Sequence, residues 1–271
     1  MEAFPDWSAA APHWDRRRDD VEEMKAELTT RLIEGLGDLR GKQVLELGAG
    51  TGELAARLAD AAGPPGSVLA SDAAAGMVEL LEKRLAAVPN ADVATLDAAQ
   101  IDRPDASFDI VVFRMGLMLM LDPGRALAEI RRVLRPGGRM AVAVWGAPQD
   151  NPWMLTVGMS AMLQGLVQGG PPIGPGGPFS LADPVDLDKR VRDAGFADVV
   201  VTPIASSRLF STSADHVDTV LALSPPLAAA VAGATAEQIA AVREQVATLT
   251  AQYRTPNGVE IPSSTVLCLA S

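Results

Sequence analysis

Two kinds of apolar pattern alternate along the chain. Short continuous apolar runs predict buried strands, and they cover residues 44–47, 67–71, 91–96, 108–113, 140–145, 197–204 and 264–270. Elsewhere apolar residues recur every three or four positions, which predicts helices with one buried face. These stretches are 53–62, 77–85, 123–134, 184–194 and much of 212–254. The succession of strands and helices predicts an α/β fold with a largely parallel sheet.

The chain begins with an aromatic arm that contains Phe4, Trp7, Trp14 and two prolines. The prolines predict an irregular segment rather than a good helix. Because only 4% of all residues are aromatic, we expect this arm to pack on the molecule, as a terminal wrap or as a lid over a ligand site. The apolar stripe after it predicts a helix that runs toward Gly35 or Gly37 and docks on the sheet. The stripe comprises Val21, Met24, Leu28 and Leu32.

The first strand ends in a turn with three glycines, Gly48-Ala49-Gly50-Thr51-Gly52. Glycine adopts positive φ readily and lets a ligand approach the backbone, and the N-terminus of the next helix offers free N–H groups. We therefore expect a nucleotide-like cofactor here. A dinucleotide fingerprint would place its third glycine one residue later, where this chain has Glu53. That spacing argues against NAD or FAD.

Asp72 follows the second strand, 20 residues beyond Gly52. A carboxylate at the carboxyl end of this strand can accept hydrogen bonds from both ribose hydroxyls of a nucleoside. The same side chain could instead cap the following helix, which contains Met77. The glycine turn favours the ribose interpretation, and the helix cap stays open as the alternative.

The composition restricts the partners of this protein. Its 271 residues, 48% of them apolar, suffice for one α/β domain with a cap. The formal net charge of −11 opposes nucleic-acid binding, which needs a basic face. No apolar run reaches the ~18 residues of a membrane span, no His/Asp/Glu cluster has metal-ligand spacing, and the single cysteine, Cys268, excludes an internal disulfide. We expect a cytoplasmic protein without metal, membrane or nucleic-acid partners.

Several features occur in the order and spacing of one enzyme family. Glu46 precedes the glycine turn by two residues, Asp72 follows the second strand, and Asp97 with Ala98 follows the third. A Phe-Asp pair opens the fourth strand, and a Leu-Arg-Pro-Gly-Gly loop precedes the fifth. With these motifs the chain resembles class I S-adenosylmethionine (SAM) dependent methyltransferases of the ubiquinone/menaquinone C-methylase type. The resemblance covers residues 43–145 and implies a Rossmann-like seven-stranded sheet with an antiparallel last strand and a helical cap.

With this fold, the chain divides into core segments and additions. The core comprises residues 41–145, 183–211 and a last strand at 259–271. The additions are an N-terminal arm and helix at 1–40, a cap insertion at 146–182 and a helical lid insertion at 212–258. We expect them to converge over the carboxyl ends of the strands, where open α/β sheets bind ligands. One stripe in the last addition would pack within the lid or form the seam of a homodimer; it contains Ile239, Val242, Val246, Leu249 and Tyr253.

The resemblance also implies roles for individual residues. Glu46 and the backbone of the glycine turn would hold the methionine end of SAM, through Gly48, Ala49, Gly50, Thr51 and Gly52. Asp72 and its neighbour Ala73 would hold the ribose. The adenine would lie against Met77, Asp97 and Ala98. Arg114 and Met115 would line the floor near the sulfonium.

The implied reaction is methyl transfer to an O, C or N atom of a small, largely apolar metabolite, in secondary metabolism or quinone-type biosynthesis. Because a sulfonium is already activated, the protein must mainly align the acceptor and exclude water. His13 is the candidate general base, since histidine titrates near neutrality, whereas His216 has the context of a structural residue at a helix start. Trp14, Met118 and Trp153 are candidate acceptor contacts. The alternatives are a SAM-binding enzyme of the cyclase type and a SAM-binding regulatory module.

Overall fold

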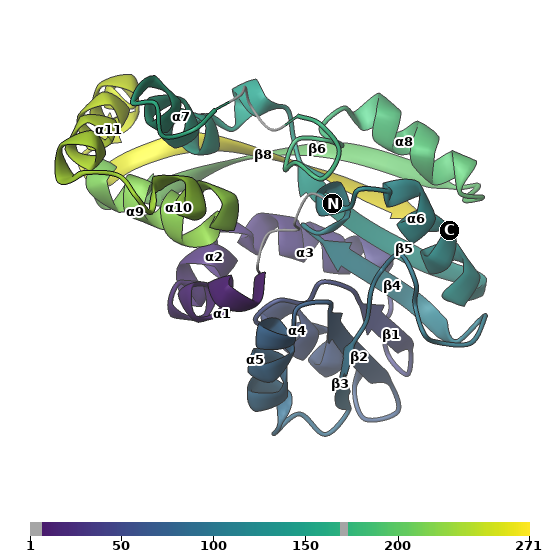
Figure 1. Cartoon of the computed structure of the whole chain (residues 1–271). Helices are drawn as coiled ribbons and strands as arrows, with labels where there is room; N and C mark the ends of the chain where they lie inside the picture. Colours follow the sequence, from purple (N-terminus) through teal and green to yellow (C-terminus); the bar gives the residue numbers. More distant parts are fainter. Residues whose placement is uncertain (1–6, 169–172) are drawn as a thin grey trace.

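The computed structural model describes residues 7–168 and 173–271 (Figure 1). Phe4 of the aromatic arm and residues 169–172 of the predicted cap insertion lie outside the described residues. The strands are β1 (Gln43–Glu46), β2 (Ser67–Asp72), β3 (Ala91–Thr95), β4 (Phe108–Arg114), β5 (Leu134–Trp145), β6 (Val199–Phe210), β7 (Arg254–Thr255) and β8 (Gly258–Ala270). The α-helices are α1 (Trp7–Arg16), α2 (Arg18–Met24), α3 (Ala26–Leu36), α4 (Glu53–Ala62), α5 (Ala75–Leu85), α6 (Pro123–Val133), α7 (Pro152–Leu163), α8 (Pro184–Asp193), α9 (Ser213–Leu223), α10 (Pro225–Val231) and α11 (Ala236–Leu249). Short 3-10 helices are η1 (Leu117–Leu119), η2 (Pro148–Asp150) and η3 (Ala251–Tyr253).

The strands form one sheet in the order β3-β2-β1-β4-β5-β8-β6, with the two-residue β7 paired to β8. The pairs from β3 to β5 are parallel. Strand β8 lies antiparallel between β5 and β6. This order confirms the predicted α/β fold, a Rossmann-like methyltransferase sheet whose last strand runs antiparallel.

Strand β4 shows why helices cover both faces of the sheet. Ile110 and Val112 are buried on one face, and Val111 and Phe113 are buried on the other, because successive strand residues point to opposite sides. The first face packs against α3, α4 and α5, and the second against α6, α7 and α8 (Figure 1). A strand buried on both sides reads as a continuous apolar run, which is why the sequence revealed it.

The N-terminal arm is a helix, and the irregular segment predicted from its prolines is wrong. Helix α1 continues through Pro12, buries Ala10 and Ala11, and packs against α5. The Ser8 hydroxyl accepts a hydrogen bond of 3.2 Å from the Gly76 N–H. A Cβ at Gly76 would approach the Ser8 carbonyl oxygen to 2.7 Å. This close tertiary packing outweighs the helical hydrogen bond that proline removes.

The helix predicted after the arm is broken in two at Lys25. Helix α2 ends at Met24, α3 begins at Ala26, and the residue between them has φ −96° and ψ 3°. The Lys25 N–H is shared between the carbonyls of Val21 and Glu22, as is common at helix ends. Helix α3 docks on the sheet as predicted, through Leu28, Leu32 and Leu36.

Strands β6 and β8 extend beyond the ranges predicted for them. Their pairing continues from Ala205 opposite Ser264 to Phe210 opposite Val259. Polar residues in the extension interrupt the apolar pattern, so the sequence predicted only residues 197–204 and 264–270 as strands. The extension is a two-stranded ribbon, and it leads from the sheet to α9, α10 and α11 (Figure 1).

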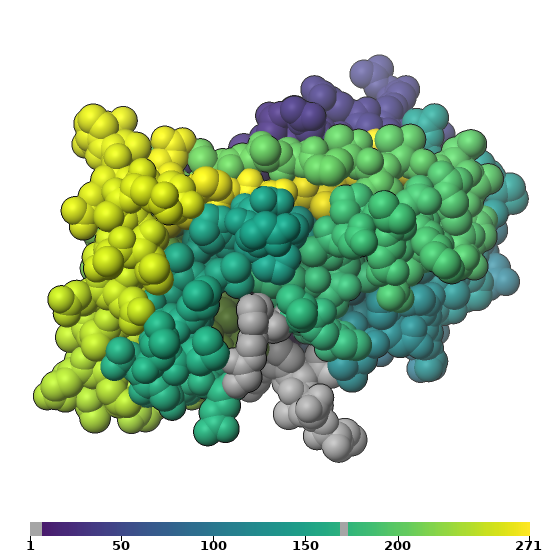
Figure 2. Space-filling view, turned by 90° about the horizontal axis from the view of Figure 1, so that it is seen from above, coloured from purple at the N-terminus to yellow at the C-terminus, as the bar shows by residue number. Residues whose placement is uncertain are grey.

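Helix α11 packs within the cap formed at this end of the ribbon. Its Val242 and Val246 are buried, and the helix lies beside α7 and α9 (Figures 1 and 2). Leu249, at the end of the same stripe, is 39% exposed. Of the two roles predicted for this stripe, the arrangement matches packing within the lid.

Candidate functional site

The sequence-predicted cofactor residues share one edge of the sheet. The strand order reverses between β1 and β4, with β2 and β3 on one side and β5 on the other. The glycine turn leaves β1 at this edge, Asp72 ends β2, and Met115 follows β4. Such a reversal opens a crevice beyond the carboxyl ends of parallel strands.

Each glycine of the turn has a positive φ: 59° at Gly48, 59° at Gly50 and 89° at Gly52. A Cβ at Gly52 would lie 2.9 Å from the Leu81 side chain, whereas a Cβ at Gly50 would meet nothing within 4 Å. The third glycine therefore allows the turn to pack on α5, and the middle one leaves room beside the backbone. No side chain caps α4 at Gly52, so the first N–H groups of that helix are available to a ligand carboxylate.

Asp72 connects the glycine turn to the second strand. Its carboxylate accepts hydrogen bonds from the Gly50 N–H at 3.1 Å and from the Ala74 N–H at 2.9 Å. Ala74 immediately precedes α5, so the bond to its N–H also holds the start of that helix. A carboxylate has about four acceptor positions, so Asp72 can still accept from a hydroxyl group. Burial raises the pKa of Asp72 above its ordinary value, and the N–H groups of Ala74, Gly50 and Ala73 oppose the shift.

Glu46 lies buried at the end of β1. Its Oε2 atom has no hydrogen-bond partner among the described residues. Burial raises the pKa of this carboxyl to about 8, and the nearby Arg114 only partly opposes the shift. A buried polar atom without a partner is costly, so this position suits a ligand that donates hydrogen bonds or carries a positive charge.

The guanidinium of Arg114 is engaged away from the floor position predicted for it. It donates hydrogen bonds to Glu22 at 2.6 Å and to Thr29 Oγ1 at 2.8 Å. Arg114 is buried and does not line the cavity described below. It therefore attaches α2 and α3 to the end of β4, which is a positioning role that the sequence did not reveal.

The residues predicted beside the adenine lie just after β2 and β3. Met77 and Ala98 are buried, whereas Ala73 and Asp97 are exposed. Asp97 Oδ1 accepts a hydrogen bond of 2.8 Å from the Ala99 N–H. A buried apolar surface beside an exposed carboxylate suits a flat heterocycle with an amino group.

A cavity of about 420 Å³ lies beneath the cap. Residues from α1, from the α2–α3 junction, from α7 and the loop after it, and from α9 and α10 line its walls. Each of the three additions distinguished in the sequence, at 1–40, 146–182 and 212–258, therefore contributes residues to the cavity wall. The candidate acceptor contacts Trp14, Met118 and Trp153 all line this cavity, together with Trp7, Met24, Lys25, Met115, Trp145, Met154, Met159 and Met162.

Met115 joins the crevice to the cavity. It follows β4 at the sheet edge and also lines the cavity floor. Its φ of 65° is unusual for a residue with a side chain, and a conformation of this kind costs about 1–3 kcal/mol. The Met115 N–H donates a 2.8 Å hydrogen bond to the Ala143 carbonyl, which helps to hold the backbone in place.

Neither histidine lines the cavity. His13 is exposed on α1, its Nδ1 lies 2.9 Å from the Arg16 guanidinium, and it does not line the cavity. This placement removes His13 as the candidate general base, because its side chain leaves the helix on a face other than that of Trp14. His216 is fully buried with Nε2 2.6 Å from the Trp153 carbonyl oxygen, and burial lowers its pKa to about 4. Its role is structural.

Two buried cations near the cavity escaped the sequence analysis. Lys25 is 8% exposed and lines the cavity, and burial lowers its pKa to about 7. Arg208 is 5% exposed, lies over the rings of Trp153 and Phe210, and has its pKa lowered by burial to about 10. No sequence signal marks either residue as buried. Lys25, for example, belongs to a run of mixed charge that is typical of a solvated helix face.

Comparisons with known proteins identify the core. Residues 44–138 match the family model described as a methyltransferase domain. The chain contains a methyltransferase domain. The chain is 37% identical over 120 residues to the demethylmenaquinone methyltransferase of Clavibacter sepedonicus, a match that covers 44% of this chain and 46% of that protein. It is 42% identical over 103 residues to the ubiquinone/menaquinone biosynthesis C-methyltransferase UbiE of Ralstonia pickettii. This match covers 38% of this chain and 42% of that protein.

These matches confirm the resemblance to class I SAM-dependent methyltransferases of the ubiquinone/menaquinone C-methylase type, whose cofactor is SAM. The chain spans about half the length of the curated relatives it matches. A putative methyltransferase of Bacillus halodurans C-125 has a similar fold, with a TM-score of 0.61, 16% identity, and coverage of 89% of this chain and 97% of that one.

The residues around the crevice fit SAM. The unpartnered Glu46 Oε2 suits the methionine ammonium group, the uncapped start of α4 suits its carboxylate, and Asp72 retains acceptor positions for the ribose. Over residues 7–168 and 173–271, no group of three or more His, Cys, Asp or Glu side chains is placed to hold a metal ion. The same part of the chain has no helix of the length and hydrophobicity that would span a membrane.

Proposed function

We propose that this protein transfers a methyl group from SAM to a small, largely apolar metabolite. The observation that carries the proposal is the cavity of about 420 Å³, which shares Met115 with the cofactor crevice. Its walls are rich in methionine, including Met24, Met118, Met154 and Met159. Unbranched thioether side chains adapt to the shape of an apolar ligand, so a substrate of this class suits the site.

The residues of this chain would act mainly by positioning. SAM supplies an activated methyl group when bound, and Glu46, Asp72 and the start of α4 would hold its polar ends. The cap would orient the acceptor and exclude water around it. Orientation and dehydration account for a large part of the rate of reactions between pre-activated groups, so a strong acid or base is not required for every acceptor.

The acceptor is best described as a flat ring that offers a carbon or oxygen atom to the methyl group. Trp145 and Trp153 line the cavity with their ring centroids 5.4 Å apart at 68°, and aromatic surfaces of this kind bind ring systems. The similar proteins named above are themselves named for menaquinone and ubiquinone biosynthesis. A place in quinone-type biosynthesis or secondary metabolism, in the cytoplasm, follows as part of the proposal.

The test is incubation of the purified protein with SAM labelled in its methyl group and an extract of small metabolites. Label in an apolar small molecule would support the proposal, and the position of the label would distinguish carbon from oxygen. SAM that is retained by the protein without any labelled product would reject methyl transfer and favour a cyclase-type enzyme or a regulatory module.

A further inference from the structure

Lys25 places one amino group in the wall of an otherwise apolar cavity. Among the described lining residues it is the only charged one, and Gln168 and Ser224 are the other polar side chains apart from tryptophan. Its Nζ atom lies 5.3 Å from the centroid of the Trp14 ring. Glu22 and Glu53 influence Lys25 only through space, without a hydrogen bond. A ligand in the cavity therefore meets an amino group that no carboxylate holds.

The backbone around Lys25 is firmly held. The residue occupies the junction between α2 and α3, and both the N–H and the Oγ1 of Thr29 donate to its carbonyl at 2.8 Å. Arg114 secures both flanking helices through Glu22 and Thr29. A group held on rigid elements by such supporting contacts can act at a defined point of a ligand.

A second buried cation increases the positive potential at this end of the cavity. Arg208 Nη1 lies 2.9 Å from the sulfur of Met24, and its guanidinium is 4.6 Å from the Trp153 ring centroid. Both Met24 and Trp153 line the cavity. Among the described residues no carboxylate pairs with Arg208 within the distance of an ion pair, although Asp20 and Asp215 act on it from farther away. A negative charge that develops beside Lys25 would be stabilised by this field.

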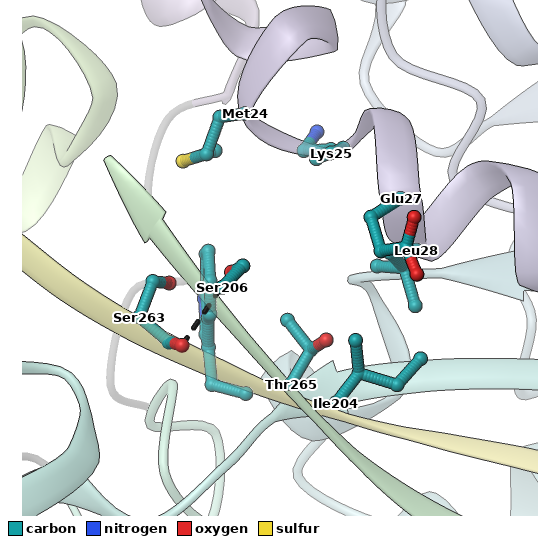
Figure 3. A pocket seen from close by; sticks show the side chains of 9 residues that line it. Met24, Lys25, Glu27, Leu28, Ile204, Ser206, Ser263 and Thr265 are labelled. Atoms are coloured by element: carbon teal, nitrogen blue, oxygen red, sulfur yellow. Dashed lines mark hydrogen bonds between the residues drawn. The ribbon is translucent and has the colours of Figure 1, made fainter. Parts of the chain in front are cut away.

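Lys25 also lines a small hollow on the side facing the sheet (Figure 3). The hollow measures about 10 Å³, a size that accommodates roughly one water molecule. Its other lining residues are the exposed Glu27, the hydroxyl-bearing Ser206, Ser263 and Thr265, and the apolar Met24, Leu28, Trp145 and Ile204. Lys25 thus has the apolar cavity on one side and a hollow of mixed polarity on the other.

We propose that Lys25 is the general base of this site and accepts the proton of an acidic hydroxyl group, a phenol or an enol, on the apolar acceptor. In this step the O–H bond breaks, an N–H bond forms at Nζ, and the electron pair stays on the acceptor as an oxyanion that is conjugated with its ring or double bond. The ammonium group releases the proton to water after the methylated product has left the cavity. The inference rests on the proposed methyl transfer, because it names the group that prepares the acceptor.

The protonation state of Lys25 agrees with this role. Burial lowers its pKa to about 7; Arg114 and Arg208 also lower it, and Glu22 and Glu53 raise it. The amine is therefore neutral, and able to accept a proton, above about pH 7. A base of this pKa matches neutral conditions, where general-base catalysis is most effective. We expect the transfer rate of the wild-type protein to rise with pH through this region.

The test uses an alkyl-substituted 4-nitrophenol as a probe, since its phenolate absorbs visible light and its neutral form does not. At a pH below the probe's own pKa, we expect the wild-type protein to bind it as the phenolate and to bind its methyl ether at least tenfold more weakly. The Lys25→Met variant should bind phenol and ether equally and should show no phenolate band. The Lys25→Arg variant keeps a positive charge and should retain the band.

The rate of methyl transfer in the Lys25 variants distinguishes a general base from a cation that only binds the phenolate. Removal of a general base costs roughly 10²- to 10⁴-fold in rate, so both Lys25 variants should lose this factor with a transferable acceptor, and the rise with pH should disappear. The Lys189→Met variant, at an exposed position on α8, is the matched control and should behave like the wild type. SAM affinity should be unchanged in all three variants, and a cooperative thermal melting transition in each should show that the fold is retained.

Persistence of the phenolate band in Lys25→Met, or full turnover in Lys25→Arg, would overturn the assignment. A wild-type protein that binds the probe only in its neutral form would also overturn it. The spectroscopic result does not depend on methyl transfer. A phenolate that forms in the cavity of a protein without any transfer activity would therefore reject the proposed function while supporting the role of Lys25.

Discussion

The cofactor side and the acceptor side of the cleft are built in opposite ways. The cofactor side comes from one stretch of chain, residues 46–98, and offers backbone groups and carboxylates at the ends of adjacent strands. The acceptor side is assembled from segments between Trp7 and Ala230 and is almost entirely apolar. Each side buries an ionisable group without an ion pair among the described residues, Glu46 on the first and Lys25 on the second. The proposed cofactor site is thus local in sequence, whereas the proposed acceptor site is not.

Arg114 lies between the two sides and connects them. It pairs with Glu22, whose pKa is lowered by the hydrogen bond to that guanidinium despite partial burial. It also opposes the raised pKa of Glu46 and contributes to the lowered pKa of Lys25. The charge of Arg114 thus acts on the buried groups of both sides, and the experiments below separate the two sides.

Deletion of residues 1–14 should have the largest effect and should act mainly on the acceptor side. It removes Trp7 and Trp14 from the cavity wall but no strand of the sheet. We expect kcat/KM for methyl transfer to fall by roughly 100-fold or more, because misplacement of the reacting groups is that costly. SAM affinity, measured by calorimetry, should fall less, because orientation and dehydration act mainly in the transition state.

A full-length double variant, Trp7→Ala with Trp14→Ala, provides the control for this deletion. It leaves the backbone of α1 in place, so a similar loss of transfer would assign the effect to the cavity wall. Full activity of the truncated protein would show that α1 is not a functional cover.

The Asp72→Ala substitution should act on the cofactor side alone. It removes charge-assisted hydrogen bonds to the ribose, worth about 1.5–3 kcal/mol, so SAM affinity should fall roughly ten- to hundredfold. Binding of the nitrophenol probe in the cavity should be unaffected. The Asp60→Ala variant, at an exposed position on α4, serves as the control, and equal SAM affinities in the two variants would reject the ribose contact.

Glu46→Gln should stabilise the ligand-free protein while weakening SAM binding. The folded-state pKa of Glu46 is raised from 4.5 to about 8, so between these values the folded state binds more protons than the unfolded state. The unfolding free energy contributed by this group therefore falls as pH rises through that window, by up to about 1.4 kcal/mol per pH unit. Urea unfolding at pH 5 and pH 8 should show this loss in the wild type and its absence in Glu46→Gln. Equal slopes would contradict the buried, unpaired state of the carboxyl.

The His13→Ala substitution should have the smallest effect. The side chain is exposed and contacts Arg16 rather than the cavity, so transfer rate and SAM affinity should stay within about twofold of the wild type, as for most surface positions. A large loss of rate with unchanged SAM affinity would restore His13 as a base candidate and would contradict the position of α1.

The same contrast explains what could be predicted from the sequence. Strands β1, β2 and β4 each contain a short apolar run, and Gly52 and Asp72 mark the turns after β1 and β2. The sheet, the crevice and the cofactor could therefore be predicted. The break at Lys25 was not, because neither glycine nor proline marks it and the apolar stripe continues across it. Helix α1 was missed because its stability comes from contacts with α5, which a local pattern does not contain.

The cavity wall shows most directly which site residues could be predicted from the sequence and which could not. Trp14, Met118 and Trp153 were predicted as acceptor contacts from their chemistry alone, and all three line the cavity. His13 was chosen because histidine as a residue type titrates near neutrality, yet the cavity-lining group whose pKa is shifted to about 7 is Lys25. A pKa shift of this kind depends on burial, which arises only when distant segments meet.

The paired ends of the ribbon make the last helical insertion an exchangeable module. Phe210 and Val259 lie opposite each other where the chain leaves β6 and returns in β8. The return begins at Gly258, which has φ 139° and whose Cβ would approach the Phe210 carbonyl oxygen to 2.2 Å. Since both ends of the insertion meet at one point, its length and sequence can change without moving any strand. Chimeras that join relatives at these two positions should therefore alter the choice of acceptor while inheriting an intact cofactor half.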